Sequence, residues 1–240
     1  MSTLSAPAAE TDVANEHPLD KAVWNALTGR QQRFAVRNDR AVRLLASVGP
    51  FAALADLSEA SFDALRPLIA EQGPATLNTL NEVTLPSGFS ITRKASLLQM
   101  VWERESEQIA WEHVKLVERD VPDMLALTAA TQPGPFGPRT IELGDYIGVR
   151  KQGKLAAMAG ERMKLDGFTE ISAVCVDPAF RGQGHAVGLM RLLIASICAR
   201  GETPFLHVIG SNEGAIAIYQ RMGFVVRRQF HLTTVDAPKV

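Results

Sequence analysis

The stretch that decides the fold is Asp177-Pro178-Ala179-Phe180-Arg181-Gly182-Gln183-Gly184-His185-Ala186. It lies between a short apolar run, residues 171–176, and a long pattern of helical spacing, residues 187–200. The first turn of a helix carries free backbone N–H groups and the positive end of the helix dipole, so it attracts anions. Gly182 and Gly184 let the backbone approach such an anion closely, and Arg181 adds a full positive charge. The stretch therefore predicts a site for a phosphorylated ligand.

Three classes of ligand use a turn of this kind. A P-loop requires Lys and then Ser or Thr after its last glycine, whereas His185 and Ala186 follow Gly184. A dinucleotide turn requires a third Gly or Ala, where Val187 stands, and an acidic residue at the end of the next strand, which here ends in residues 210–212, Gly-Ser-Asn. The P-loop is therefore excluded and the dinucleotide fold disfavoured. The third class is the pyrophosphate loop of acyl-CoA-dependent N-acyltransferases.

From about Trp111 to Val235 the chain resembles the GNAT superfamily of N-acyltransferases, near its glycine N-acyltransferase-like branch. The pyrophosphate signature of that family has Arg or Gln, then Gly three residues later and Gly or Ala two residues after that, which Arg181, Gly184 and Ala186 match. About 30 residues downstream, the chain also matches the family's Asn-x-x-Ala-x-x-x-Tyr helix and the Gly-Phe that follows it. The residues on those positions are Asn212, Ala215, Tyr219, Gly223 and Phe224.

The second half of the chain shows the order of elements that this fold has. The patterns predict strands at 113–117, 145–150, 154–161, 170–176, 204–209 and from 224 onward, with helices at 121–130, 187–200 and 213–222. Residues 132–139 hold three prolines and two glycines, which predicts a loop. The resemblance thus implies an α/β (α+β) fold, the GNAT acyl-CoA N-acyltransferase fold, with a mixed central sheet flanked by helices.

We expect three regions along the chain: a disordered tail at 1–17, an N-terminal α/β domain at 18–105 and the GNAT domain at 111–240. A charged stretch at 101–107 is interpreted as a linker. In the N-terminal region, residues 58–72 predict a capped helix and residues 89–102 a long strand. Two interpretations of this region stay open: a degenerate second copy of the same fold, or a helical cap on the catalytic half.

Composition sets further bounds. Of the 240 residues, 46% are hydrophobic, enough to bury a full core, and 25 basic against 26 acidic residues offer no electrostatic case for nucleic acid. The two cysteines, Cys175 and Cys198, lie in apolar segments and are interpreted as free thiols of a reducing compartment. The absence of a signal peptide and of a long apolar run leads us to expect a cytoplasmic protein with no membrane partner.

The resemblance implies acetyl-CoA as co-substrate and no metal. Backbone N–H groups of Gln183 to Ala186 would hold the pyrophosphate, and the backbone of Val174 and Val176 would pair with the pantetheine arm. The residues expected to bind the cofactor are Val174, Cys175, Val176, Arg181, Gly182, Gln183, Gly184, His185, Ala186, Asn212 and Tyr219.

Two residues are expected to carry the chemistry. Glu170 is the candidate general base, because strict alternation would place it on one face with Ser172, Val174 and Val176, where apolar neighbours would raise its pKa. His113 and His207 are weaker alternatives. Tyr219, seven residues after Asn212 and on the same helix face, is implied by the resemblance to protonate the departing thiolate.

The expected function is an N-acetyltransferase in which a primary amine attacks acetyl-CoA directly in a ternary complex. The alternative is a non-catalytic acyl-CoA sensor or scaffold. The acceptor is a small molecule or a peptide, Arg139 is a candidate for receiving a carboxylate on it, and the protein is a monomer or homodimer. A covalent intermediate on Cys175 is disfavoured, because alternation points this thiol away from Glu170 and no paired His is evident.

Overall fold

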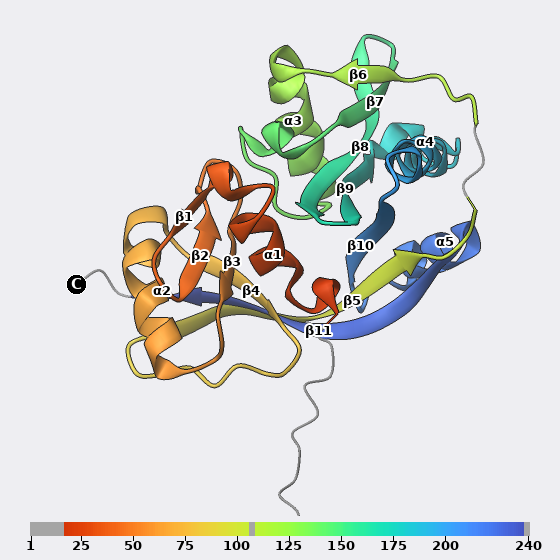
Figure 1. The fold of residues 1–240 in the computed structure, drawn as a ribbon. Coiled ribbons are helices and arrows are strands. Elements are labelled where there is room, and N and C mark those ends of the chain that lie inside the picture. Colours follow the sequence, from red (N-terminus) through yellow and green to blue (C-terminus); the bar gives the residue numbers. More distant parts are fainter. Residues whose placement is uncertain (1–16, 106–108, 238–240) are drawn as a thin grey trace, which may run out of the picture.

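Two long strands, β5 (Ser90–Trp102) and β11 (Phe224–Asp236), lie side by side at the centre of an eleven-stranded sheet in the computed structural model, which describes residues 17–105 and 109–237. They pair antiparallel along their whole lengths, from Phe224 opposite Trp102 to Asp236 opposite Ser90. In Figure 1 this pair runs beneath both halves of the molecule. The two halves of the chain therefore share one sheet.

The C-terminal half has the element order that its sequence predicts. Its elements before β11 are β6 (Val114–Leu116), α3 (Val121–Thr131), β7 (Tyr146–Lys151), β8 (Lys154–Leu165), β9 (Phe168–Val176), α4 (His185–Ala199), β10 (Thr203–Ile209) and α5 (Glu213–Met222). Helix α4 begins two residues earlier than its apolar pattern indicates, because Gly184 adopts a left-handed φ of 78° and serves as its N-cap. The mixed sheet flanked by helices is thus confirmed (Figure 1).

The N-terminal half repeats this plan in shortened form. Its elements before β5 are α1 (Ala22–Thr28), β1 (Ala35–Arg37), β2 (Ala41–Leu44), β3 (Phe51–Leu54), α2 (Glu59–Gln72) and β4 (Ala75–Thr79). The strand order is β1-β2-β3-β4-β11-β5-β10-β9-β8-β7-β6. If β6 is left aside, the sequence of parallel and antiparallel pairings from β1 inward is the same as that from β7 inward. Each half has a parallel pair joined through a helix, β3-α2-β4 and β9-α4-β10. This topology favours a degenerate copy over a helical cap.

Each half places its last strand in the other half. Strand β5 lies between β10 and β11, and β11 lies between β5 and β4. The expected boundary near residue 105 therefore separates the halves in sequence, while in space their sheets interlock. Of the charged stretch 101–107, the first two residues belong to β5, and residues 106–108 lie outside the described residues.

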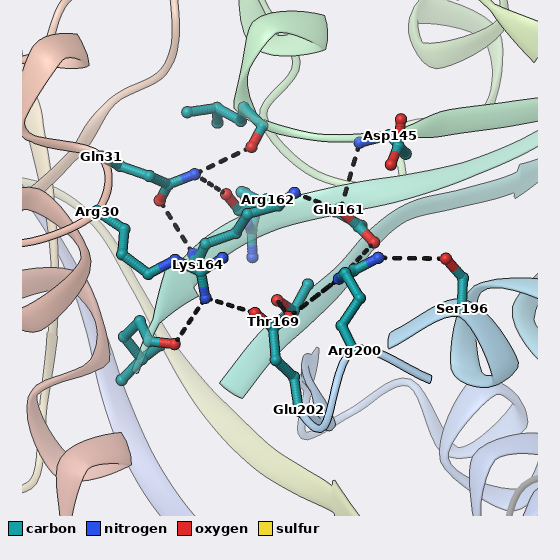
Figure 2. A network of polar contacts seen from close by, with 12 residues as sticks. Arg30, Gln31, Asp145, Glu161, Arg162, Lys164, Thr169, Ser196, Arg200 and Glu202 are labelled. Carbon is teal, nitrogen blue, oxygen red and sulfur yellow. Dashed lines mark hydrogen bonds and ion pairs between the residues drawn. The ribbon is translucent and has the colours of Figure 1, made fainter. Parts of the chain in front are cut away.

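Side chains at the junction of the two halves bury both apolar and polar contacts. Residues of α1 pack with Met163, Leu165 and Phe205 of β8 and β10 in one core cluster. The Gln31 amide donates to the carbonyl oxygens of Arg162 (2.6 Å) and Leu143 (3.1 Å) and accepts from Lys164 N (3.0 Å). Figure 2 shows this contact beside the buried Glu161, whose carboxylate pairs with Lys164 and Arg200. The N-terminal half thus supports the strand that borders the site described below.

The expected disordered tail, residues 1–17, lies outside the described residues except for His17. That residue is ordered, since its Nδ1 accepts from Leu19 N (3.1 Å) and its ring packs against Phe168. Within residues 17–105 and 109–237, the structure contains no helix of the length and apolarity needed to cross a bilayer.

Gly160, in the middle of β8, leaves the space that the Tyr146 ring fills. A Cβ on Gly160 would lie 2.2 Å from Tyr146 Cδ1, and Tyr146 is fully buried. We therefore expect Gly160→Ala to lower the free energy of unfolding in urea by about 1–3 kcal/mol, as overpacked cores do. The matched control is Gly214→Ala in α5, where a Cβ meets open space. Alanine is the better helix former there, so that control should be neutral or stabilising; equal behaviour of both variants would contradict the packing argument.

Candidate functional site

The site is a cleft that opens where the parallel strands β9 and β10 diverge. These strands pair only between residues 168–170 and 203–205, and beyond Glu170 and Phe205 the neighbouring backbones separate. The cleft has a volume of about 760 Å³. From the C-terminal half before β11, its lining comprises Thr131 to Pro135, Arg162, Val174, Cys175, Val176, Phe180, Arg181, Gly182, Gly184, His185, Ala186, Val187, Met190, His207, Val208, Ile209, Asn212, Ala215, Ile218 and Tyr219. All the predicted cofactor residues except Gln183 are therefore brought together.

The glycine turn has the backbone shape that the sequence predicts. Gly182 and Gly184 adopt φ angles of 76° and 78°, which residues with a side chain rarely do. The Asp177 carboxylate caps the preceding 3-10 turn by accepting from Ala179 N (2.9 Å). The exposed Arg181 side chain donates to Val176 O at 3.4 Å, a weak contact that leaves most of its donors to the cleft. The N-terminus of α4 thus meets the cleft with positive charge.

The sequence analysis did not predict that the rings of Trp111 and His185 pack together at this turn. The Trp111 ring packs edge-to-face on His185 at 6.1 Å, and a Cβ on Gly188 would lie 2.3 Å from it. Both ring nitrogens of His185 are buried without a hydrogen-bond partner among the described residues. Gly188, a glycine inside an apolar helix pattern, is the signal that could have indicated a close-packed ring.

Strand β9 carries a bulge that reverses the expected side-chain alternation. Ser172 pairs with Gly160 and Cys175 with Met158, so two residues face one, and Ala173 adopts a φ of 53°. Ile171, Val174 and Val176 consequently all face α4. Glu170, next to Ile171, points to the opposite face, so the prediction that it shares a face with Val174 and Val176 is wrong. The extra residue of the bulge is the physical reason.

Glu170 lies in a buried ion pair. Its carboxylate accepts from Arg162 Nε (2.8 Å) and Nη2 (2.6 Å) and contacts His207 Nδ1 (2.7 Å). Burial alone would raise the pKa of Glu170, but the Arg162 charge and the hydrogen bonds from Arg162 and His207 outweigh it, and the pKa is lowered. The expected rise is therefore wrong. A carboxylate held ionised in this way is better suited to positioning its neighbours than to taking up a proton.

His207 is held in one orientation by partners on both sides. Gln99 Nε2 donates to Leu19 O (2.9 Å), and Gln99 Oε1 accepts from Arg227 (2.8 Å), so the orientation of the amide is defined. Gln99 Nε2 also lies 3.1 Å from His207 Nε2, which therefore accepts, and Nδ1 carries the hydrogen donated to Glu170. The ring belongs to a buried polar chain from Arg162 to Arg227.

Helix α5 places Asn212 and Tyr219 on the cleft, as their spacing predicts. Asn212 Oδ1 accepts from Ala215 N (3.2 Å) and caps the helix, a structural role beside the expected one. Burial raises the pKa of Tyr219 to about 12. The phenol therefore stays protonated at neutral pH and is available as a donor within the cleft.

The other candidate residues lie elsewhere or are unreactive. The bulge places Cys175 on the same face of β9 as Glu170, so the alternation argument against its nucleophilic role is wrong. Burial raises the pKa of Cys175 to about 11, so this residue is a thiol at neutral pH, which argues against that role. His113 is exposed, with its Nδ1 2.8 Å from Trp111 O, and does not line the cleft. Arg139 pairs through two nitrogens with Glu142, at 2.6 and 2.8 Å, and also lies outside the lining. The structure therefore does not support the prediction that Arg139 binds a carboxylate of the acceptor.

Among the described residues, the N-terminal half does not repeat the glycine turn at the corresponding place. Its parallel strands β3 and β4 pair only at Phe51–Thr76 and Ala52–Leu77 and then diverge in the same manner. At the start of α2, however, the Asp56 carboxylate accepts from Ser58 N, Ser58 Oγ and Ser61 Oγ. The place where α4 offers its N-terminus to an anion is thus occupied in α2 by the chain's own carboxylate. Within the described residues, no group of His, Cys, Asp or Glu is arranged to hold a metal ion.

The fold and cleft together define an α/β protein of the N-acyltransferase class. The family model described as FR47-like protein matches residues 146–232. A crystal structure of a GNAT-family acetyltransferase from Novosphingobium aromaticivorans DSM 12444 is 41% identical, covers 93% of this chain and 100% of its own, and superposes with a TM-score of 0.86.

Several curated relatives carry the name ribosomal protein bS18-alanine N-acetyltransferase. The one from Haemophilus ducreyi is 30% identical over 48% of this chain and 86% of its own length. The one from Escherichia coli K12 is 38% identical over 35% of this chain, and the match spans 59% of that relative's length. The chain belongs to the GNAT family of N-acetyltransferases.

Proposed function

We propose that the protein transfers an acetyl group from acetyl-CoA to a primary amine by direct attack in a ternary complex. The observation that carries this proposal is the cleft between the diverging strands β9 and β10, with the glycine turn at one end and Tyr219 in its wall. The exposed backbone edges of Val174 and Val176 suit an extended arm with amide groups, because no β10 residue pairs with them. Acetyl-CoA has both the pyrophosphate and such an arm.

The chemistry assigns each group one task. The amine nitrogen bonds to the thioester carbonyl carbon, the carbonyl oxygen takes negative charge, and the carbon–sulfur bond then breaks to leave a thiolate. Tyr219 passes its phenolic proton to that thiolate as the bond breaks and then regains a proton from solvent, which also takes up the proton released by the amine nitrogen. The bulge at Ala173 takes the nearby Val174 N–H out of regular strand geometry, where it can donate to the carbonyl oxygen. Glu170 positions Arg162 and His207 rather than acting as the base.

The acceptor in this proposal is a small molecule or the N-terminus of a peptide. The relatives named bS18-alanine N-acetyltransferases support an amine acceptor, and the resemblance to the glycine N-acyltransferase-like branch supports a small one. The test is release of CoA thiol from acetyl-CoA with a panel of amines, beside calorimetric titration with acetyl-CoA. Binding with no thiol release for any amine would instead identify the non-catalytic sensor.

Replacing Tyr219 by Phe removes the proposed proton donor while leaving the ring in place. We expect Tyr219→Phe to lower kcat by about 10²-fold or more, as loss of a positioned acid does, with acetyl-CoA affinity unchanged within about twofold. The buried ring packs edge-to-face on Phe224, so the variant should fold. Thiol release and calorimetric titration measure the two quantities. An unchanged kcat would remove Tyr219 from the mechanism.

A further inference from the structure

The wall of the cleft that faces the acceptor comes from the N-terminal half and β11. Beyond the diverging strands, the lining continues over the face of the central strands. The residues there are Phe51, Thr76, Asn78, Arg93, Leu97 and Leu232. The loop after α3, residues 132–135, also lines the cleft, and a second hollow is again lined by Arg93 together with α3 and this loop. Arg93 therefore stands at the junction of the two hollows.

The charge along this wall has one sign. Among the described residues that line the cleft and the adjoining hollow, none is Asp or Glu, while Arg93, Arg162 and Arg181 are present. The Glu170 carboxylate, which contacts the cleft residues Arg162 and His207, is fully buried and already paired with Arg162. Arg181 belongs to the glycine turn, which precedes the N-terminus of α4. Arg93 is thus left as the exposed cation on the acceptor wall, and no ion pair is formed by it within the described residues.

We infer that Arg93 selects the acceptor by its charge, and that the acceptor is an amine carrying a carboxylate. This inference rests on the proposed function and deepens it. A guanidinium binds a carboxylate through two parallel hydrogen bonds, which fixes both its position and its orientation. A polycationic acceptor would meet like charge and no compensating carboxylate, which disfavours it. The N-terminal half, which has no phosphate site of its own, thereby supplies the specificity of the C-terminal half.

The placement of Arg93 explains why the chain uses this residue and not another arginine. Arg162 is held by Glu170, and Arg139 by Glu142 outside the cleft. Arg93 sits on β5 with Leu97 four residues further along the same face, and both line the cleft. Because β5 is inserted between β10 and β11, a residue of the first half reaches the active cleft of the second.

The experiment compares matched amines that differ only in the carboxylate. Thiol release is measured for a panel of free amino acids, for the corresponding amino-acid amides, for diamines, and for peptides with an acidic or a neutral second residue. We expect kcat/KM for the best amino acid to exceed that for its amide by at least about tenfold, as one charged hydrogen bond supplies. In Arg93→Gln this ratio should fall by at least about tenfold, and Arg93→Glu should favour diamines.

The matched control is Lys94→Gln, the neighbouring exposed cation, which alternation places on the opposite face of β5 and which does not line the cleft. Its ratio should equal that of the native chain. Preference for acidic peptides over free amino acids, lost in Arg93→Gln, would support the same role of Arg93 with a peptide as the source of the carboxylate. Equal turnover of amino acids and amides, or a ratio that Arg93→Gln leaves intact, would overturn the inference while the proposed function stands.

A binding readout separates failure of this inference from failure of the proposed function. In the presence of CoA, N-acetyl amino acids should raise the Tm of the native chain more than N-acetyl amino-acid amides do, and Arg93→Gln should abolish the difference. This difference requires no turnover. If no amine gives thiol release but the Tm difference is present, the proposed transferase activity is overturned and the role of Arg93 is supported. If both sets of ligands shift the Tm equally, the role of Arg93 is overturned.

Discussion

A carboxylate placed in the glycine turn is expected to abolish acetyl-CoA binding. In the double variant Arg181→Glu, Gly184→Asp, the charge at the mouth of the cleft reverses, and a second negative charge enters the first turn of α4, where the phosphates need N–H donors. Gly184 has a φ of 78°, and a Cβ there would lie 3.3 Å from the Trp111 ring, so the turn itself is also disturbed. Because each charged hydrogen bond is worth about 1.5–3 kcal/mol, we expect affinity to fall by at least about a hundredfold in calorimetric titration.

The control for this result carries the same changes at two positions of α4 and its C-terminal end that do not line the cleft. Gly201, just after α4, has a φ of 74° with open space around its Cβ position, and Arg191 is exposed on α4. Arg191→Glu, Gly201→Asp thus reproduces the charge change and the left-handed position away from the cleft, and it should bind acetyl-CoA like the native chain. Native affinity in the first double variant, with far-UV circular dichroism showing a folded chain, would exclude the turn as the phosphate site.

Removal of the Glu170 carboxylate is expected to have the largest effect on stability. In Glu170→Ala the Arg162 guanidinium, whose side chain is 11% exposed, loses its partner inside the protein. Breaking a buried pair from one side typically costs about 3–5 kcal/mol, so we expect a loss of that size in urea unfolding. Glu170→Gln keeps the volume and one acceptor oxygen and should lose less. The exposed carboxylate of Asp166, in the turn between β8 and β9, provides the control Asp166→Ala, expected to change stability by less than about 0.5 kcal/mol.

The pH dependence of stability has a definite sign at Glu170. Its pKa is lower in the folded protein than in the unfolded chain, where a glutamate titrates near about 4.3. Its contribution is therefore complete above that unfolded value and is lost as the pH falls below it toward the folded pKa. The native chain should lose stability between about pH 5 and pH 3 more steeply than Glu170→Gln. Parallel curves would show that the carboxylate is not held ionised.

The same variant separates the two roles considered for Glu170. A positioning residue that stays ionised leaves the pH profile of kcat/KM above pH 6 unchanged in shape when Gln replaces it. A general base would imprint its own titration on that profile, and Glu170→Gln would remove it. We expect the unchanged shape, together with a lower kcat from the disturbed contact to His207.

The local features of the site could be predicted from the sequence because each depends on residues close together in the chain. The glycines at 182 and 184 determine the turn, and the apolar spacing after it determines α4. The interval from Asn212 to Tyr219 places both residues on one face of α5. The resemblance to GNAT enzymes was carried by these same short stretches, and it extends over the half of the chain where the local patterns are clear.

The errors concern features with no local signature. The bulge at Ala173 carries no glycine, so nothing in residues 170–176 distinguishes β9 from a regular strand, and the predicted face of Glu170 came out reversed. Arg162 and Gln99 were missed because they meet Glu170 and His207 only through pairing of strands far apart in sequence. Arg139 is a local exception: its partner Glu142 is only three residues away, but the 3-10 turn at Thr140–Leu143 that brings the two together was not predicted.

The sequence by itself determined the phosphate turn, the order of elements in the second half and the helix that carries Tyr219, because hydrogen bonds and apolar periods within some 15 residues define them. Only the tertiary structure decided which strands neighbour one another. The exchange of β5 and β11 between the halves follows from the energy of a continuous sheet, which no short segment encodes. That exchange brings Gln99 to His207 and Arg93 to the lining of the cleft, and so gives the N-terminal half a place in it.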